Sequence, residues 1–361
     1  MRFTFIDRFR GLIGVMMALG HSNYYFNAAW LSLDPLDPFF DNTGQFWLRY
    51  MGYLCAPGFL AMNGAMVYWA YKRRISHGLS HAQASWELIQ RGLFLIVMQL
   101  VWVNASWSGL ARLRLDHFGI IATIGTSMIL LTLIVRWQWW QRSILAAALF
   151  VGQPFLLKIN YDIDGPWHYL NQFLFDAGDF NKYPVLPWFA LAVVGSIMAH
   201  FWFERWQTDS ERANKSMLIG LGLTALALIV RLGNGFGNLF ETGDFMSWSF
   251  MLVQKYPPTL VHQLWLSGAV IFFVGLMCRI GIHSNIFAFL GIVGKVPLFF
   301  YAVHIPLLAI FAKRMGYFYH EGAVKESLIG WVILVAIMLP LAYGFAKVKK
   351  KYRKNWFIRM I

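Results

Sequence analysis

Long apolar runs separated by short polar stretches dominate the sequence. An α-helix needs about 20 mainly apolar residues to cross a bilayer, and about ten runs approach that length. They lie near 9–30, 50–71, 90–107, 118–136, 142–158, 184–203, 215–232, 259–279, 296–313 and 326–346. The pattern therefore predicts an all-α fold, a polytopic helical bundle with about ten transmembrane helices.

Composition supports the same class. The chain has 361 residues, of which 58% are hydrophobic and 13% charged, whereas soluble domains average about 25% charged residues. No polar stretch is long enough to form a soluble domain of its own. We expect one transmembrane domain over residues 1–346 and a basic cytoplasmic tail over 347–361.

The basic residues predict the orientation. The formal net charge is +14, and most of the 31 lysines and arginines fall at helix ends and in alternate short loops. Such an asymmetry follows the positive-inside rule and places both termini in the cytoplasm. It also argues against nucleic acid as a partner, because the positive-inside rule already accounts for basic residues at helix ends and in short loops. The tail is expected to touch anionic lipid.

Two ionisable residues share one face of the first predicted helix. Arg10 and His21 are eleven residues apart, and eleven steps of about 100° return a helix to nearly the same face. Because charged and titratable groups are costly in lipid, we expect the pair to face a cavity. In the alternative interpretation, Arg10 extends to lipid phosphates and His21 is a packing residue.

Gly14 lies between them and could leave room for a thin ligand such as an acyl-pantetheine arm. The phosphates of its nucleotide would then lie near Arg8, Arg10, Arg91 and Lys295 at the cytoplasmic end. The alternative at Gly14 is close helix packing.

Further polar groups occur at other predicted helices. His304 and Tyr301 share a face at i,i+3, and Pro306 should kink their helix and free the carbonyl of Ala302 for another partner. His117 lies at the outer end of the fourth run. Imidazoles are suited to general-base catalysis near neutral pH. No metal site is predicted, because no ligand spacing joins the histidines.

The predicted outer loops differ in chemistry from the cytoplasmic ones. Asp162 and Asp164 occur among aromatic residues, and the loop 233–258 is rich in glycine, amide and acidic residues. Hydrogen-bonding groups beside aromatic rings suit a hydroxyl-rich ligand such as a sugar. Ordinary solvated loops are the alternative.

Six short motifs occur in order along nearly the whole chain. They are FIDRFRGLIGVMMALGH (5–21), APGFLAMNG (56–64), HFGIIATIG (117–125), YPVLPWF (183–189), QKYPP (254–258) and LGIVGKVPLFFYAVH (290–304). Together they resemble the transmembrane acyltransferase superfamily, and within it the bacterial heparan-α-glucosaminide N-acetyltransferase-like branch. They are also similar to membrane proteins that O-acylate envelope polysaccharides.

The resemblance implies an acyltransferase of the bacterial inner membrane. It would move an acetyl or other short acyl group from cytoplasmic acyl-CoA to a glycan hydroxyl or amine near the outer face, without a metal. His21 becomes the expected catalytic residue with Arg10 as its companion. His304, His117 and Tyr301 would orient the thioester or acceptor. The matching motifs add Trp188, Lys255 and Tyr256 to Asp162 and Asp164 as substrate-binding candidates.

The chain departs from the family pattern at three positions. The heparan enzyme has Asn where this chain has His21, Lys295 replaces the usual Arg, and Thr259 replaces a Ser. A transporter of a sugar or lipid-linked substrate with a histidine proton relay is the alternative function, and a scaffold subunit is a third. The acceptor, the acyl chain, an acyl-enzyme step and a homo-oligomeric state are left open by the sequence.

Overall fold

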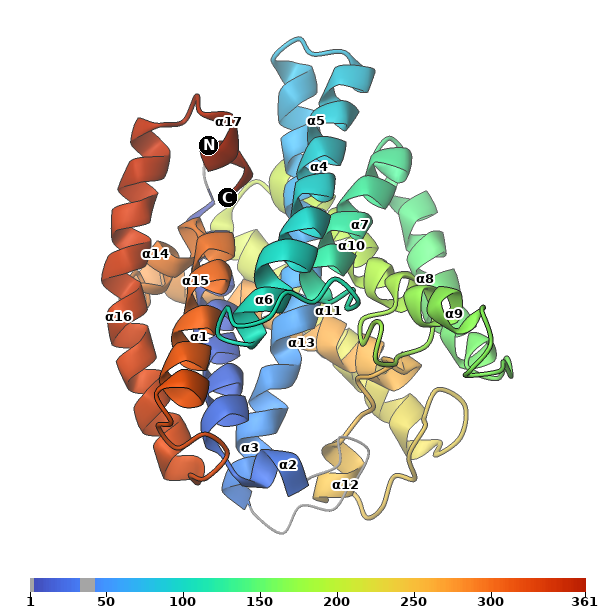
Figure 1. Ribbon diagram of the computed structural model, residues 1–361. Coiled ribbons are helices and arrows are strands. Elements are labelled where there is room, and N and C mark those ends of the chain that lie inside the picture. The colour runs from blue at the N-terminus through green and yellow to red at the C-terminus, as the bar shows by residue number, and fades with distance from the viewer. Residues whose placement is uncertain (1–2, 33–42) are drawn as a thin grey trace. The chain divides into compact units, whose positions relative to one another are not determined.

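The computed structural model describes residues 3–32 and 43–361, which are mainly helical (Figure 1). Helix accounts for 74% of the structure, and the described residues form no β-strand. The all-α prediction is thereby confirmed. In chain order the first helices are α1 (Thr4–Phe26), α2 (Ala29–Ser32), α3 (Thr43–Met51), η1 (Gly52–Leu54), α4 (Cys55–Ser76), α5 (His81–Met98), η2 (Gln99–Val103), α6 (Asn104–Trp107), α7 (Ile120–Ile134), α8 (Trp139–Leu156) and α9 (His168–Leu174).

The C-terminal half continues in the same way. Its helices are α10 (Val185–His200), η3 (Phe201–Arg205), α11 (Asp209–Leu232), α12 (Trp248–Met251), α13 (Leu260–His283), α14 (Leu290–Lys295), α15 (Pro297–Ala309), η4 (Ile310–Arg314), α16 (Val324–Lys351) and α17 (Trp356–Met360). Each of the predicted apolar runs coincides with one of the longer helices or with a helix and its continuation.

Six of the described helices are long and apolar enough to cross a membrane. They cover His81–Trp107, Val185–Arg205, Asp209–Leu232, Leu260–His283, Pro297–Arg314 and Val324–Lys351. The helix Ile120–Ile134 is apolar but shorter. α1 is 23 residues long, but its first turns contain Asp7, Arg8 and Arg10, which lower its hydropathy. The chain is therefore a multi-pass membrane protein.

The chain divides into two compact units, each made of several segments. The first unit contains Met1–Cys55, Val101–Arg114 and Met277–Ile361, and the second contains Ala56–Leu100 and Leu115–Leu276. In the first unit α1 packs against α14, α15 and α16, which lie beside it in Figure 1. In the second unit α5 packs against α7, and α10 packs against both α7 and α8.

Glycines allow the closest helix crossings in the first unit. A Cβ atom on Gly11 of α1 would collide with the carbonyl of Leu290, and one on Gly294 of α14 would collide with the carbonyl of Asp7. α1 and α14 thus approach each other backbone to backbone. Small residues commonly permit such contacts between membrane helices, where van der Waals packing replaces the hydrophobic effect.

The second unit uses the same device at other crossings. Gly92 of α5 and Gly125 of α7 each approach the carbonyl of the other, as do Gly220 of α11 and Gly268 of α13. A buried arginine, Arg231, anchors the loop that follows α11. Its guanidinium donates to the carbonyls of Phe250 at 2.9 Å and Ser249 at 2.7 Å, among others. This loop therefore has a fixed path although it lacks long helices.

Candidate active site

His21 and His304 meet inside the first unit. Nδ1 of His21, on α1, lies 2.7 Å from Nε2 of His304, on α15, which is hydrogen-bond distance. His304 is fully buried and His21 is partly buried. The two histidines come from helices 283 positions apart in the sequence, so the fold has joined the two intramembrane imidazoles that the sequence had indicated separately.

The two rings lie in one plane. Their planes differ by 1° and their centroids are 5.0 Å apart. This distance equals the 2.7 Å N···N hydrogen bond plus the two ring radii, laid along one line. The rings therefore meet edge to edge and are not stacked face to face. A ring N–H and a ring lone pair both lie in the imidazole plane. The arrangement is therefore well aligned for a hydrogen bond.

The backbone of α15 fixes the orientation of the His304 ring. Nδ1 of His304 lies 2.8 Å from the carbonyl oxygen of Phe300, one helical turn earlier. The ring is thus held at both nitrogens, by a main-chain acceptor on one side and by His21 on the other. Pro297, at the first position of α15, starts the helix with a pre-set backbone angle.

Aromatic side chains surround His21. The ring of Trp107 lies edge to face at 5.1 Å, and the ring of Tyr301 lies edge to face at 6.3 Å. Trp107 is itself held through its carbonyl, which accepts hydrogen bonds from the hydroxyl of Tyr25 at 3.2 Å and from Nζ of Lys313 at 3.0 Å. These hydrogen bonds hold Trp107 in place beside His21.

The predicted phosphate-binding residues of the first unit differ in accessibility. Arg10 is partly exposed and forms a 3.8 Å ion pair with Asp7. Lys295, at the end of α14, is exposed. Arg8 is buried, and it donates to the amide oxygen of Asn285 at 3.0 Å. Arg10 and Lys295 are therefore better placed than Arg8 to meet an anion.

The space beside Gly14 is occupied. A Cβ atom on Gly14 would lie 3.1 Å from Cγ1 of Val293 on α14. Of the two interpretations of Gly14, the structure thus favours close helix packing and not an open channel for a thin ligand. The helix face bearing Arg10 and His21 is interrupted at this point by the α1–α14 contact.

Two of the predicted residues belong to the second unit. Nδ1 of His117 lies 3.0 Å from the carbonyl oxygen of Asp179, in the segment before α10. Arg91 lies in α5 and is partly exposed. Neither is part of the His21–His304 arrangement in the first unit.

The expected acceptor-binding residues also lie in the second unit. Asp162 and Asp164 are exposed, and Oδ1 of Asp162 accepts the backbone N–H of Asp164 at 3.0 Å in a tight turn. Trp188 is fully buried in α10, and the ring of the equally buried His262 lies 5.8 Å from it, edge to face. Trp188 is therefore a core residue, whereas the two aspartates are open to solvent.

Lys255 and Tyr256 form a second polar group in this unit. Nζ of Lys255 lies 5.1 Å from the centroid of the Tyr256 ring, and the Tyr256 hydroxyl shares a 2.9 Å hydrogen bond with that of Tyr183. Burial favours the neutral phenol, but the Lys255 charge and the Tyr183 hydrogen bond outweigh it and lower the pKa of Tyr256. The group can therefore offer a polarised hydroxyl to a ligand.

Sequence reasoning missed three residues of interest. Trp107 and Lys313, which support His21, lie in none of the six motifs, and His262 is not among the sequence candidates although it lies in an apolar run. A tryptophan at the end of an apolar run is usually an interfacial residue, so Trp107 gave no specific signal. His262 could have been found as an ionisable residue within a predicted span.

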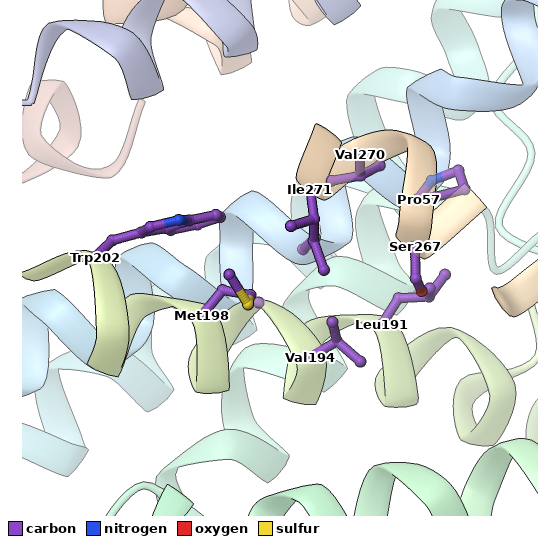
Figure 2. Close-up of a pocket in the computed structure, with 10 residues that line it drawn as sticks. Pro57, Leu191, Val194, Met198, Trp202, Ser267, Val270 and Ile271 are labelled. Atoms are coloured by element: carbon purple, nitrogen blue, oxygen red, sulfur yellow. The ribbon is translucent and has the colours of Figure 1, made fainter. Parts of the chain in front are cut away.

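A narrow pocket in the second unit carries no catalytic chemistry. Figure 2 shows its lining from α4, α10, η3 and α13. The lining residues are Pro57, Ala61, Leu191, Val194, Gly195, Met198, Trp202, Ser267, Val270 and Ile271. Ser267 supplies the one hydroxyl among them. None of the residues predicted for catalysis contributes to it, so the His21–His304 arrangement remains the candidate active site.

Within residues 3–32 and 43–361, no three His, Cys, Asp or Glu side chains gather in a way that could hold a metal ion. In the comparison with protein families, residues 2–230 match the family described as heparan-alpha-glucosaminide N-acetyltransferase, catalytic. Comparison with curated proteins gives no match. The match includes Arg10 and His21 and covers more than half of the chain, so the chain belongs to the heparan-alpha-glucosaminide N-acetyltransferase family and is an acyltransferase.

Proposed function

We propose that this protein transfers an acetyl or other short acyl group from cytoplasmic acyl-CoA to a hydroxyl or amine of a glycan or glycoconjugate. Family membership supports acyl transfer, acetyl-CoA as the usual donor and a carbohydrate as acceptor. The observation that carries the assignment of a site is the 2.7 Å contact between His21 and His304. A pair of aligned imidazoles, one buried and one partly exposed, is suited to moving protons.

The proposed topology places donor and acceptor on opposite sides of the membrane. In it the ten predicted spans cross the bacterial inner membrane, residues 1–346 form the catalytic domain, and both termini and the basic tail 347–361 are cytoplasmic. The distribution of basic residues supports this orientation. Arg10 and Lys295 would then lie at the donor side, where their charges suit the phosphates of CoA.

His21 is the proposed general base. Its imidazole takes a proton from the acceptor hydroxyl or amine while the acceptor atom attacks the thioester carbonyl. A positioned general base contributes about 10²- to 10⁴-fold to a rate. Tyr301, whose ring lies 6.3 Å from that of His21, is suited to orient the thioester.

The acceptor would be bound by polar and aromatic groups of the outer loops. Asp162 and Asp164 are exposed and offer hydrogen-bond acceptors for sugar hydroxyls. Lys255 and Tyr256 offer a charge and a ring, and His117 would act from the segment before α7. Trp188 is buried and would support this region from the core. These assignments propose which residues bind the carbohydrate acceptor that the family implies.

The alternative is a transporter in which the two histidines relay protons. The same hydrogen bond between His21 and His304 favours it, because hydrogen-bonded imidazoles can pass a proton between them. The two functions differ in one respect: only the transferase breaks a thioester.

The test is an assay of purified protein in detergent with labelled acetyl-CoA and a panel of hexosamine and oligosaccharide acceptors. Release of the CoA thiol and transfer of label are measured for the wild type and for the His21→Ala variant. The His77→Gln variant is the matched control, since His77 is exposed in the loop after α4. We expect His21→Ala to lose about 10²- to 10⁴-fold in kcat and His77→Gln to match the wild type.

Acetyl-CoA binding is followed in the same samples by calorimetry. Activity equal to wild type in His21→Ala would remove His21 from the mechanism. If the wild type neither binds acetyl-CoA nor cleaves its thioester, and instead shows proton-coupled sugar uptake in vesicles, the transporter would replace the transferase as the function.

A further inference from the structure

We propose that His304 is a positioning residue, which keeps the proton of the His21 imidazole on Nδ1 and so makes Nε2 of His21 the basic nitrogen. The catalytic role that follows from this tautomer rests on the proposed function. The protons are assigned from two hydrogen bonds and from the burial of His304.

The first step is the contact between His304 and its own helix. Nδ1 of His304 lies 2.8 Å from the carbonyl oxygen of Phe300. A carbonyl oxygen can only accept a hydrogen bond. Nδ1 of His304 must therefore carry a hydrogen, because two lone pairs facing each other at this distance would repel.

The second step concerns the other nitrogen of His304. A neutral imidazole carries one N–H and one acceptor nitrogen, so a hydrogen on Nδ1 leaves Nε2 of His304 as an acceptor. A hydrogen on both nitrogens would make His304 a cation. His304 has no exposed surface, and an isolated charge at such a position carries a large desolvation cost. The neutral form with an accepting Nε2 is therefore favoured.

The third step transfers this assignment to His21. Nδ1 of His21 faces the accepting Nε2 of His304 at 2.7 Å, so Nδ1 of His21 is the donor. The coplanar rings, which differ by 1° in orientation, direct the N–H along the lone pair. Nε2 of the neutral His21 then carries the lone pair. The chain of donors runs from His21 through His304 to the backbone of α15.

This tautomer defines what His21 does in the transfer. Nε2 of His21 accepts the proton of the acceptor O–H or N–H as the new bond to the acyl carbon forms. The C–S bond then breaks, and the proton on Nε2 passes to the departing sulfur of CoA. The overall exchange is acceptor and acyl-CoA to acylated acceptor and CoA thiol, and His21 ends as it began.

The hydrogen bond to His304 assists His21 both before and after its Nε2 takes up the proton. It prevents the opposite tautomer, in which Nε2 would hold a hydrogen and could not accept one. When Nε2 is protonated, the donating Nδ1–H shares the positive charge with the lone pair of His304. Among the described residues, the titratable groups near the pair include the phenol of Tyr301. Tyr25 and Lys313 are linked to the pair through the Trp107 carbonyl.

The direct test is ¹⁵N NMR of protein labelled at the histidine ring nitrogens, with His21→Gln and His304→Gln spectra to assign the signals. At neutral pH we expect Nδ1 of His21 to show the signal of a protonated nitrogen and Nε2 that of an unprotonated one. In the His304→Ala variant we expect a mixture of both His21 tautomers. A protonated Nε2 on His21 in the wild type would overturn the proposal.

The kinetic test compares His304→Ala with His304→Gln, because an amide oxygen of Gln can still accept the Nδ1–H of His21. We expect a loss of about 10- to 100-fold in kcat for Ala, a part of the roughly 10²- to 10⁴-fold of the base itself, with a shifted acidic limb of the pH profile. The Gln variant should recover most of this loss. A wild-type kcat and pH profile in a folded His304→Ala variant would contradict the proposal.

The two tests separate this inference from the proposed function. The expected tautomer without any acyl transfer would retain the proton assignment and reject the transferase. Acyl transfer that depends on His21, together with the opposite tautomer, would retain the transferase and reject the role of His304. The tautomer of His21 is read from the wild-type spectrum, and the Gln variants serve only to assign its signals.

Discussion

The indole N–H of Trp102 donates a 2.8 Å hydrogen bond to the carbonyl oxygen of Ala302. This carbonyl would otherwise accept from the backbone nitrogen of residue 306, but that residue is proline and has no N–H. The expectation that Pro306 frees the Ala302 carbonyl for another partner is thereby confirmed. The new partner joins the η2 segment to α15, two positions before His304.

Substitution of Trp102 by Phe should therefore destabilise the protein. The ring volume is largely kept, but the carbonyl loses its donor in a region where lipid offers no replacement. Interhelical hydrogen bonds in membranes contribute about 0.6–2 kcal/mol, and we expect a loss of this size in the free energy of unfolding. Thermal unfolding in detergent measures it, and Trp140→Phe, at an exposed position on α8, is the control.

A double-mutant cycle identifies the cause. Pro306→Ala restores the N–H within the helix, so the Trp102→Phe substitution should cost much less in that background. Equal losses in both backgrounds would mean that packing of the indole, and not its hydrogen bond, explains the effect.

The contact between α1 and α14 offers a matched pair of glycines. Gly294→Ala places a methyl group against the carbonyl of Asp7, whereas a methyl group on Gly291 of the same helix meets no atom within 4 Å. We expect Gly294→Ala to lower the melting temperature strongly and to reduce the yield of folded protein. Gly291→Ala should leave both unchanged or slightly raised, since alanine favours the helix by about 1 kcal/mol. Similar behaviour of the two variants would show that the helices do not meet so closely.

Much of the helical architecture is encoded locally, and the active site is not. The apolar runs near 184–203 and 259–279 fall on α10 with η3 and on α13, because hydrophobicity over 20 residues suffices to identify a buried or spanning helix. His21 and His304 were likewise recognised, each from its own run. Their pairing depends on which faces of α1 and α15 meet, and no pattern within either helix specifies that.

The environment of Arg8 shows the same limit. Its place among other basic residues at the start of the chain favoured an exposed anion-binding role. In the fold, Asn285 lies against Arg8, from a segment 277 residues away. Only tertiary packing distinguishes Arg8 from Arg10, two positions later in the same helix.

The loop before α16 should respond to pH through His320. Burial, together with the positive charge of Lys313, lowers the pKa of His320. Because the folded-state pKa is below the ordinary value of about 6.5, the neutral ring stabilises the fold above that pH, and the contribution is lost as pH falls. We expect the melting temperature to fall between pH 7.5 and pH 5, and to fall less in His320→Gln. An equal fall in both would assign the effect to other groups.

Arg8 and Arg10 should separate into a structural and a ligand-binding residue. Arg10→Gln removes a partly exposed charge, so we expect a higher KM for acetyl-CoA, with a nearly unchanged melting temperature. Arg8→Gln breaks the hydrogen bond from the buried Arg8 to the exposed Asn285, and we expect a loss of about 1.5 kcal/mol in the free energy of unfolding, the lower end of the range for hydrogen bonds of charged groups. Steady-state kinetics and thermal unfolding of both variants test the division.

Because salt screens an exposed charge more than a buried one, added salt should reduce the difference in KM between wild type and Arg10→Gln. A KM effect confined to Arg8→Gln would reverse the two assignments.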